Sequence, residues 1–431
     1  MEILRYSDSD FESRLSGLLG RTAFDAEVEA HVAGILSRVQ NEGDAALTAL
    51  SGEYDRFAVA PDRFQVTVEE IERATGAISS RTRKAIRTSC RQVRDFAAQR
   101  IPKPWSYSPR NGVILGERFA PFSRIGAYVP GGTAPLVSTV LHTVTLAAVA
   151  GVEEIVVITP PGPEGDVHPA ILYAAQYAGA TEIYRLGGVY GIGALAYGTE
   201  SISRVEKIVG PGNAYVTAAK RQVYGYVSLD LVAGPSEIMI IADDTADPRF
   251  VAADMLSQAE HGSGREQAVL VTTSRELVET VQNELAAQSA KLRRAECVSQ
   301  VLESGVFVIE VATLEEAADL ASRYAPEHLE IMTRRAGQLA KRVTAAGAIF
   351  LGPWTPEPVG DFVAGPSHVL PTGGAARYFS GLTVEQFFRR MSVVNYQKSA
   401  LARELPHVER FAATEGLDAH GRSGSIRFER T

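Results

Sequence analysis

The chain has 431 residues, a hydrophobic share of 45% and a formal net charge of −8. This length exceeds one comfortable core, so we expect at least two domains, and the acidic balance with scattered Lys and Arg argues against nucleic acid and against an anionic membrane surface as partners. No apolar run approaches the roughly 18 residues of a membrane span, and the N-terminus lacks signal-peptide regions, so the cytoplasm is the expected compartment.

Helical segments come first in the chain, and an α/β pattern follows them. Residues 24–103 carry helical periodicity. From Ile125, short β-branched runs alternate with Gly/Pro turns and helical stretches, and the alternation restarts after "AGPSEIMIIADD" and ends with the strand "GAIFLG". This pattern is typical of doubly wound parallel sheets. Residues 381–431 look helical and amphipathic, and we expect them to form an appendage.

Two Gly-rich stretches are candidates for holding a phosphate. "KIVGPGNAYVTAAKRQV" reads as a strand, a Gly-Pro-Gly-Asn turn and a helix start, which would point backbone N–H groups at an anion. "YRLGGVYGIGALAYGT" contains G-x-G-x-x-A between a strand and a helix, without an obvious ribose-binding acid after it. Tight turns and close helix packing would explain either stretch equally well.

An acid and an imidazole, Glu327 and His328, stand side by side in "ASRYAPEHLEI". Because proline suits the first position of a helix, Pro326 predicts a loop-to-helix junction, with both side chains near the surface. Such a pair can also be explained without any function, by a Glu that complements the helix dipole and a solvated His.

Candidate metal ligands gather in the second half of the chain. Cys90 and Cys297 lie far apart, so reduced thiols are expected and a metal would have to use His, carboxylate or amide ligands, which suits Zn²⁺, Mn²⁺ or Co²⁺. Gln258 and His261 stand three residues apart on an expected helix and could share one ion, although a capped helix end explains them too. The other candidates beside Gly, Pro or acids are His328, Asp361, His368 and His420.

Taken together, these stretches resemble the histidinol dehydrogenase family, zinc-dependent enzymes of histidine biosynthesis. The match runs from about residue 28 to residue 427, and many short motifs in a fixed order make it specific. The motifs are "YVPGGTAPLVSTVL", "GPGNAYVTAAKR", "AGPSEIMIIAD", "SQAEHG", "APEHLEI", "VGDFVAGPSHVLPTGG" and "EGLDAH".

The resemblance implies an NAD-dependent oxidation of L-histidinol, through bound L-histidinal, to L-histidine in a homodimer with shared active sites. It implies Glu327 and His328 as the catalytic pair and one Zn²⁺ per subunit on Gln258, His261, Asp361 and His420. The NAD-contacting positions would be Tyr128, Tyr190 and Asn213. The substrate-binding positions would be Ser236, Gln258, His261, His328, Asp361, His368, Glu415 and His420.

The residue types suit this chemistry. Alcohol oxidation needs a base for the hydroxyl proton, and a neutral imidazole at His328 would serve near neutral pH. The second oxidation needs water to add to the aldehyde, which Glu327 would activate. The metal would hold the imidazole and amine of the substrate and so position it.

Four positions depart from the pattern of the family. Tyr190 stands where a cofactor-contacting Gln is expected, so it would stack on the dinucleotide or bond it differently. Ser367 replaces the commoner Asn of "GPNH", and His142 and Leu146 stand where Met and Pro are usual. We interpret these changes as the mark of a subfamily, with a place for His142 near the cofactor as the alternative.

The expected fold is α/β, with two incomplete Rossmann-like doubly wound domains and small helical terminal segments. The predicted parts are an N-terminal helical segment, a catalytic and metal-binding domain, an NAD-binding domain and a tail that reaches the partner subunit. One alternative function is the oxidation of another primary alcohol, such as a sulfonated diol, by a related dehydrogenase. The other is metal binding without redox chemistry. The boundaries are 1–23 for the first segment, 24–127 with 236–380 for the catalytic domain, 128–235 for the NAD domain and 381–431 for the tail.

Overall fold

This computed structural model describes residues 2–21, 25–131, 135–232, 234–261 and 264–429. By their internal packing the residues divide into two compact units. The first unit comprises Met1–Arg100 and Phe122–Gln386, and the second comprises Ile101–Pro121 and Phe387–Thr431.

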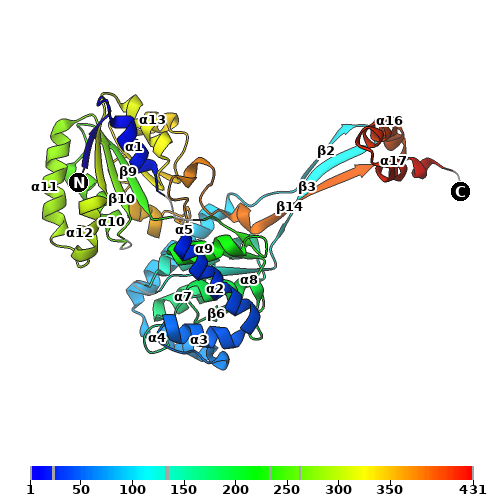
Figure 1. Ribbon diagram of the computed structural model, residues 1–431, viewed down its shortest axis with the longest axis horizontal. Helices are drawn as coiled ribbons and strands as arrows, with labels where there is room; N and C mark the ends of the chain where they lie inside the picture. Colours follow the sequence, from blue (N-terminus) through cyan, green and yellow to red (C-terminus); the bar gives the residue numbers. More distant parts are fainter. Residues whose placement is uncertain (1, 22–24, 132–134, 233, 262–263, 430–431) are drawn as a thin grey trace. The chain divides into compact units, whose positions relative to one another are not determined.

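A six-stranded parallel sheet forms one part of the first unit, in the order β1-β11-β10-β9-β12-β13 (Figure 1). Helices α10, α11 and α12 pack on one face and α1 and α13 on the other, each with its own hydrophobic cluster. Strand β9 is buried along its whole length, as its apolar sequence "EIMIIA" requires. The strands are β1 (Glu2–Arg5), β9 (Glu237–Ala242), β10 (Gln267–Thr272), β11 (Val306–Glu310), β12 (His328–Met332) and β13 (Ala348–Leu351); the helices are α1 (Phe11–Leu19), α10 (Pro248–Ala259), α11 (Arg275–Ser289), α12 (Ala295–Ser304), α13 (Leu314–Tyr324), α14 (Ala336–Leu339) and α15 (Glu357–Phe362).

A five-stranded parallel sheet, in the order β6-β5-β4-β7-β8, forms the other part of the first unit. Two parallel doubly wound sheets were expected from the alternating pattern, and this prediction is confirmed. The strands are β4 (Arg124–Tyr128), β5 (Glu154–Ile158), β6 (Glu182–Tyr184), β7 (Lys207–Val209) and β8 (Ser228–Leu229); the helices are α2 (Ala26–Glu42), α3 (Asp44–Tyr54), α4 (Val68–Ala77), α5 (Ser80–Ala98), α6 (Val137–Ala150), α7 (Pro169–Ala178), α8 (Gly188–Tyr197) and α9 (Ala214–Val223).

The packing of the N-terminal segments differs from the predicted domain division. Helices α2 and α3 share a hydrophobic core with α8, α9 and the five-stranded sheet, whereas residues 24–127 were assigned to the domain of residues 236–380. Residues 1–23 were expected to be helical, but β1 lies within them and pairs with β11 at the edge of the six-stranded sheet. The sequence carries no local sign of these partners, because both contacts are made with segments far along the chain.

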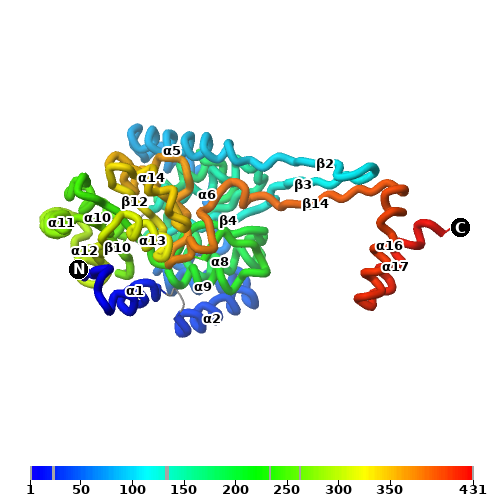
Figure 2. The backbone as a smooth tube through the Cα atoms, turned by 90° about the horizontal axis from the view of Figure 1, so that it is seen from above, coloured from blue at the N-terminus to red at the C-terminus, as the bar shows by residue number. Residues whose placement is uncertain are grey.

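The second unit is a three-stranded antiparallel sheet with two helices (Figure 2). The expectation of a purely helical tail is wrong at β14, because this strand pairs along its whole length with β3, about 270 residues earlier. Among the described residues of this unit, the buried hydrophobic side chains are only Val113, Phe387, Ala400 and Ala412. The elements are β2 (Trp105–Arg110), β3 (Val113–Pro121), β14 (Phe388–Tyr396), α16 (Lys398–Glu415) and α17 (Asp418–Ser425).

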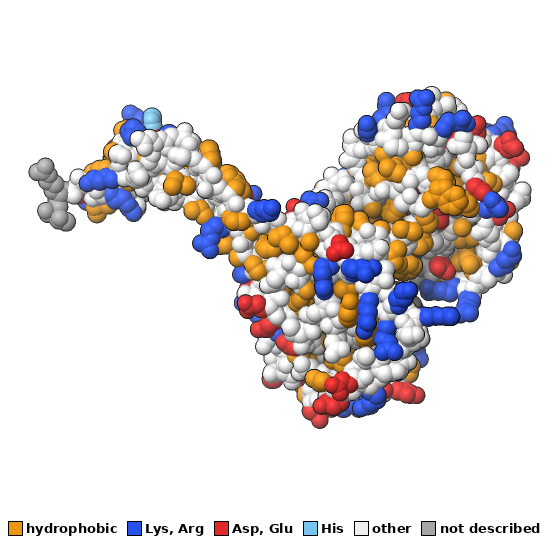
Figure 3. All heavy atoms as spheres, turned by 180° about the vertical axis from the view of Figure 1, so that it is seen from behind, with side chains coloured by type: hydrophobic (Ala, Val, Ile, Leu, Met, Phe, Trp, Pro, Cys, Tyr) orange, Lys and Arg blue, Asp and Glu red, His pale blue; other side chains and the backbone are white. Residues whose placement is uncertain are grey.

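Basic side chains gather along α5, so the prediction that Lys and Arg are scattered is wrong for this helix. A groove of about 670 Å³ runs along this helix, and Figure 3 shows Lys and Arg gathered on one face of the molecule. Among the described residues, no helix is long and apolar enough to cross a membrane. The cations that line the groove are Arg83, Lys84, Arg87, Arg91 and Arg94.

Candidate active site

Glu327 and His328 stand at the start of a central strand of the six-stranded sheet. The expected helix at this point is wrong: α13 ends at Tyr324, its C-cap Ala325 has a positive φ of 53°, and β12 begins at His328 after Pro326. The reason is that β9 and β13 bind this segment from both sides, which a helix could not satisfy. The expected surface exposure is wrong as well, since the two residues are only 5% and 2% exposed.

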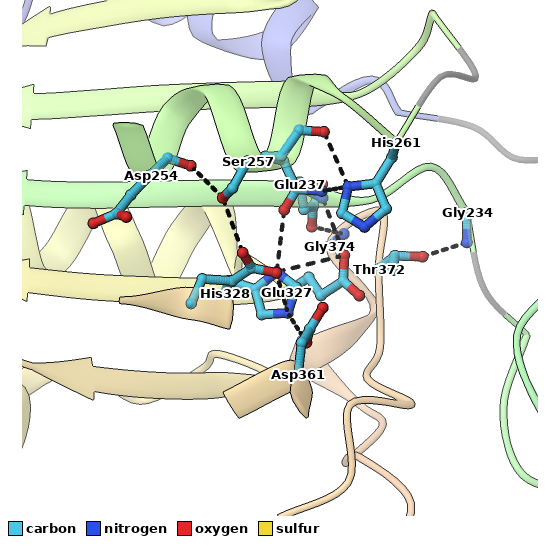
Figure 4. A network of polar contacts seen from close by, with 12 residues as sticks. Gly234, Glu237, Asp254, Ser257, His261, Glu327, His328, Asp361, Thr372 and Gly374 are labelled. Carbon is cyan, nitrogen blue, oxygen red and sulfur yellow. Dashed lines mark hydrogen bonds and ion pairs between the residues drawn. The ribbon is translucent and has the colours of Figure 1, made fainter. Parts of the chain in front are cut away.

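The imidazole of His328 lies among polar groups from helices α10 and α15 (Figure 4). Its Nδ1 is 3.1 Å from Oε1 of Gln258 on α10. Its Nε2 is 3.6 Å from the Asp361 carboxylate and 3.9 Å from that of Glu357. This Nε2 has no hydrogen-bond partner among the described residues although it is buried. The ring is therefore held through Nδ1, while Nε2 is left without a hydrogen bond in the part of the chain that the structure describes.

Carboxylates control the charge of this site. Burial alone would lower the pKa of His328, but Glu327, Asp361 and Glu357 outweigh it and raise the value to about 10. Burial raises the pKa of Glu327 to about 8, against the opposing effect of His328. In the chain by itself, the acids thus hold a proton on the imidazole, and a cation among them would take the place of that proton.

One acid beside His328, Glu357, was not predicted from the sequence. His328, Glu357 and Asp361 form a group whose ligand atoms all lie within 4.8 Å of one another, close enough for one metal ion. The Glu357 carboxylate accepts a hydrogen bond from Ser257 at 2.9 Å, and its backbone N–H donates to Glu330 at 2.7 Å. Glu357 follows Pro356 in a stretch with no familiar ligand spacing, so only the fold brings it to the site.

Three of the four predicted metal ligands come from the first unit. Gln258 and His261 are neighbours as expected, with 2.9 Å between the Gln258 amide nitrogen and Nδ1 of His261. Asp361 stands on α15 and faces His328. Imidazole, carboxylate and amide groups around an unpartnered buried nitrogen fit a borderline cation such as Zn²⁺. His420 and Glu415 belong to the second unit, where both are exposed.

His368 is held by contacts from α6. Its Nε2 is 3.2 Å from the hydroxyl of Thr139, and its ring stacks on His142 at 4.6 Å between centroids. Ser367 donates a hydrogen bond to the backbone oxygen of His142 at 3.0 Å. Two departures from the family pattern, at residues 142 and 367, therefore touch each other, and His142 lies against His368 rather than in the cavity described next.

A cavity of about 660 Å³ opens at the carboxyl ends of the strands of the five-stranded sheet. The expected strand–turn–helix order is confirmed at both Gly-rich stretches, in β7 to α9 and in β6 to α8. Asn213 caps α9 by accepting bonds from the N–H groups of residues 215 and 216 at 3.1 Å. The lining residues include Tyr128, Pro130, Pro160, Gly188, Tyr190, Asn213 and also His261.

The hydroxyl of Tyr190 is already occupied. It donates to Asp55 and accepts the backbone N–H of Gly187 at 3.0 Å. The side chain therefore offers its ring, not a free donor, to a molecule in the cavity. Asp55 and His31 also line this cavity and were not predicted, because neither stands in a recognisable motif.

Ser236 lies in a second hollow, next to the first. This cleft has a volume of about 680 Å³. Gly212 and Asn213, in the turn before α9, line one side of it. Pro235, Ser236 and Arg265, which precede strands β9 and β10, line the other. Asn213 and His31 line both hollows. A ligand bound over α9 can therefore reach the start of β9.

Parallel doubly wound sheets bind nucleotides at the carboxyl ends of their strands, next to glycine turns and helix N-termini. The cavity has this position, and an acid–imidazole pair lies buried in the adjoining sheet. The fold and the site thus define a nucleotide-dependent α/β enzyme with a buried acid–imidazole pair.

Comparison with known proteins identifies the family. The model of the family described as histidinol dehydrogenase matches residues 20–428. A histidinol dehydrogenase of Heliobacterium mobile is 42% identical over 430 residues and covers 100% of both chains, and one of Synechococcus sp. is 45% identical over 97% of each. The crystal structure of histidinol dehydrogenase from Elizabethkingia anophelis has a TM-score of 0.93 at 35% identity, covering 99% of this chain and 98% of that one. The chain belongs to the histidinol dehydrogenase family and is an NAD-dependent oxidoreductase.

Proposed function

We propose that this site oxidises L-histidinol to L-histidine in two steps, with two NAD⁺ and with L-histidinal held between them. The observation that supports the proposal most directly is the buried pair of Glu327 and His328, where His328, Glu357 and Asp361 lie close enough to hold a metal ion. His261, which contacts Gln258 beside this group, also lines the cavity at the five-stranded sheet. One substrate carbon can then meet both the acid–base pair and a hydride acceptor.

Each step needs a different proton acceptor. In the first, hydride leaves the alcohol carbon for NAD⁺ and the hydroxyl proton passes to Nε2 of His328, the nitrogen without a partner. In the second, water adds to the aldehyde, Glu327 takes a proton from that water, and the second hydride leaves the same carbon. Binding contacts to the substrate would come from Ser236, His368 and Glu415.

The proposed metal is one Zn²⁺ per subunit on Gln258, His261, Asp361 and His420. When bound, it supplies an anchor for the imidazole and amine of the substrate. Its charge among the acids also permits the neutral His328 that the first step requires, since the carboxylates keep the imidazole protonated in the chain alone.

Stoichiometry tests the function itself. We expect two NADH per L-histidinol, with histidine as the product and little free aldehyde, because one site carries both a proton acceptor and a water activator. Absorbance at 340 nm with a limiting amount of substrate gives the ratio, and chromatography identifies the product. One NADH per substrate with accumulating aldehyde would contradict the two-step reaction.

Because Glu327 and His328 are given different roles, substitutions at the two positions should affect the two half-reactions unequally. Glu327→Gln should impair oxidation of supplied L-histidinal more than the alcohol step, since only the former consumes water, whereas His328→Asn should impair both. Reduction of histidinal by NADH reports the alcohol step in reverse. If each variant loses the two half-reactions to the same extent, the assignment of roles is wrong.

We further propose a homodimer in which the second unit completes the site of the other chain. The support is that this unit buries few hydrophobic side chains while Trp105, Val394 and Phe411 are at least half exposed, so it needs a surface to pack on. Glu415 and His420 would then act on the partner. The absence of nucleic-acid and membrane partners and a cytoplasmic location stay predictions.

A further inference from the structure

Arg21 is a buried cation just beyond the end of α1, and the proposed function gives it no role. Its side chain is only 6% exposed. One guanidinium nitrogen pairs with the Glu237 carboxylate, and another donates to the backbone oxygen of Tyr324 at 2.6 Å. The guanidinium also lies 3.7 Å above the centre of the Tyr324 ring. Three different contacts therefore hold one charge in one place.

Glu237 connects this cation to the catalytic pair. It is the first residue of β9 and is 1% exposed. Its backbone N–H donates to Oε2 of Glu327 at 3.0 Å, while its carboxylate accepts the N–H of Gly374 at 3.3 Å (Figure 4). The side chain of Glu237 thus fixes a loop that follows His368, and its main chain fixes the proposed water activator.

We propose that Arg21 and Glu237 form a positioning pair for Glu327, so that the N-terminal segment controls the second, aldehyde-oxidising step of the reaction. This inference rests on the proposed role of Glu327. The pair does not touch the substrate; it sets where the Glu327 carboxylate stands and which charges surround it.

The charge balance explains why both members are needed. Glu327 shares its buried surroundings with Glu237, Asp361, His328 and Tyr324. Without Arg21, Glu237 would be a buried carboxylate without a cation, in direct contact through its backbone with a second acid. Repulsion or local rearrangement would then move Glu327 first, because its Oε2 is held by the same residue. His328 is less affected, since Gln258 on α10 holds its ring.

The contacts of Arg21 suit arginine and no other side chain. A planar guanidinium can pair with a carboxylate, donate to a carbonyl and stack on an aromatic ring at once, whereas a lysine ammonium cannot do all three. Arg21→Lys should therefore recover only part of the function.

The test compares the two half-reactions in variants of Arg21 and in matched controls. In Arg21→Met, oxidation of L-histidinal by NAD⁺ should fall at least about tenfold, within the loss of up to about a hundredfold that misplacing a catalytic group causes. Reduction of L-histidinal by NADH should fall less than about threefold, because it does not use Glu327 as a water activator. Arg21→Met/Glu237→Gln should regain much of the lost oxidation, since the uncompensated charge is removed. Arg14→Met is the matched control, because Arg14 on α1 contacts strand β1 instead, through an ion pair with Glu2 and a hydrogen bond to the backbone oxygen of Ile3.

The outcomes separate this inference from the function on which it rests. Glu327→Gln, measured in parallel, must itself lose the oxidation of L-histidinal more than its reduction. If it does not, the proposed role of Glu327 is wrong, and this inference is wrong with it. If Glu327→Gln is selective while Arg21→Met lowers both half-reactions equally, or neither, Arg21 is a structural residue and the inference is wrong. Should Arg21→Met fail to fold, the double variant and Arg21→Lys decide: a selective loss in Arg21→Lys supports the positioning pair, and equal loss contradicts it.

Discussion

Removal of the metal should abolish turnover while NAD⁺ binding survives. The proposed ligands Gln258, His261 and Asp361 lie around His328, and only His261 also lines the cofactor cavity. We therefore expect the affinity for NAD⁺ to change by less than about tenfold, or about 1.4 kcal/mol. Calorimetric titration of NAD⁺ into chelated protein measures the binding, and absorbance at 340 nm measures the turnover.

Two controls make this result specific. One Zn²⁺ per chain should restore activity to the chelated protein, and Asp361→Asn should not regain it under the same conditions. Elemental analysis shows whether the chelated protein is free of metal. Full turnover in metal-free protein would mean that catalysis does not need the ion. Loss of NAD⁺ binding upon chelation would mean that cofactor and metal share one site.

Mixed dimers should recover activity from two inactive variants. Homodimers of His328→Ala and of His420→Ala should each be nearly inactive, because each lacks one member of every site. After unfolding and refolding as an equal mixture, half of the dimers are mixed. Each mixed dimer combines an intact core with an intact tail once, so the mixture should show roughly a quarter of wild-type activity by two-fold symmetry.

The same experiment can place His420 in its own chain. If the tail served the subunit that carries it, every site in the mixture would contain one substitution and no activity would return. Differently tagged chains show whether exchange took place, and a mixture of the two wild-type tagged chains, refolded in the same way, gives the reference activity. An inactive mixture with demonstrated exchange would overturn the shared site.

Local signals were sufficient where the chain forms a strand, a turn and a helix in sequence. The β-branched run at Lys207–Val209, the Gly-Pro-Gly-Asn turn and the cap at Asn213 all lie within a few residues, and their structure follows from the sequence. At Pro326 the local rule failed. The strand that follows exists because β9 and β13 bind it from both sides, and neither partner is visible near residue 328.

The candidate site shows the same limit. The motifs placed Gln258, His261 and His328, but Glu357, Asp55 and Arg21 belong to no motif and meet the site only through the sheets. A buried acid or cation is costly without partners, so such residues are informative once burial is known. From the sequence alone, each of them has the appearance of an ordinary surface charge.

Strand β1 has a consequence for the synthesis of the chain. Its residues Glu2–Arg5 pair with β11, which lies about 300 residues later in the chain and leaves the ribosome correspondingly later. At 5–20 residues per second, roughly 15–60 s pass before that partner exists. The five-stranded sheet, in contrast, has all its strands once Leu229 has emerged. The five-stranded sheet can thus reach its native pairing before β1 does, and β1 remains an unpaired strand that must be kept from wrong partners until β11 has been made.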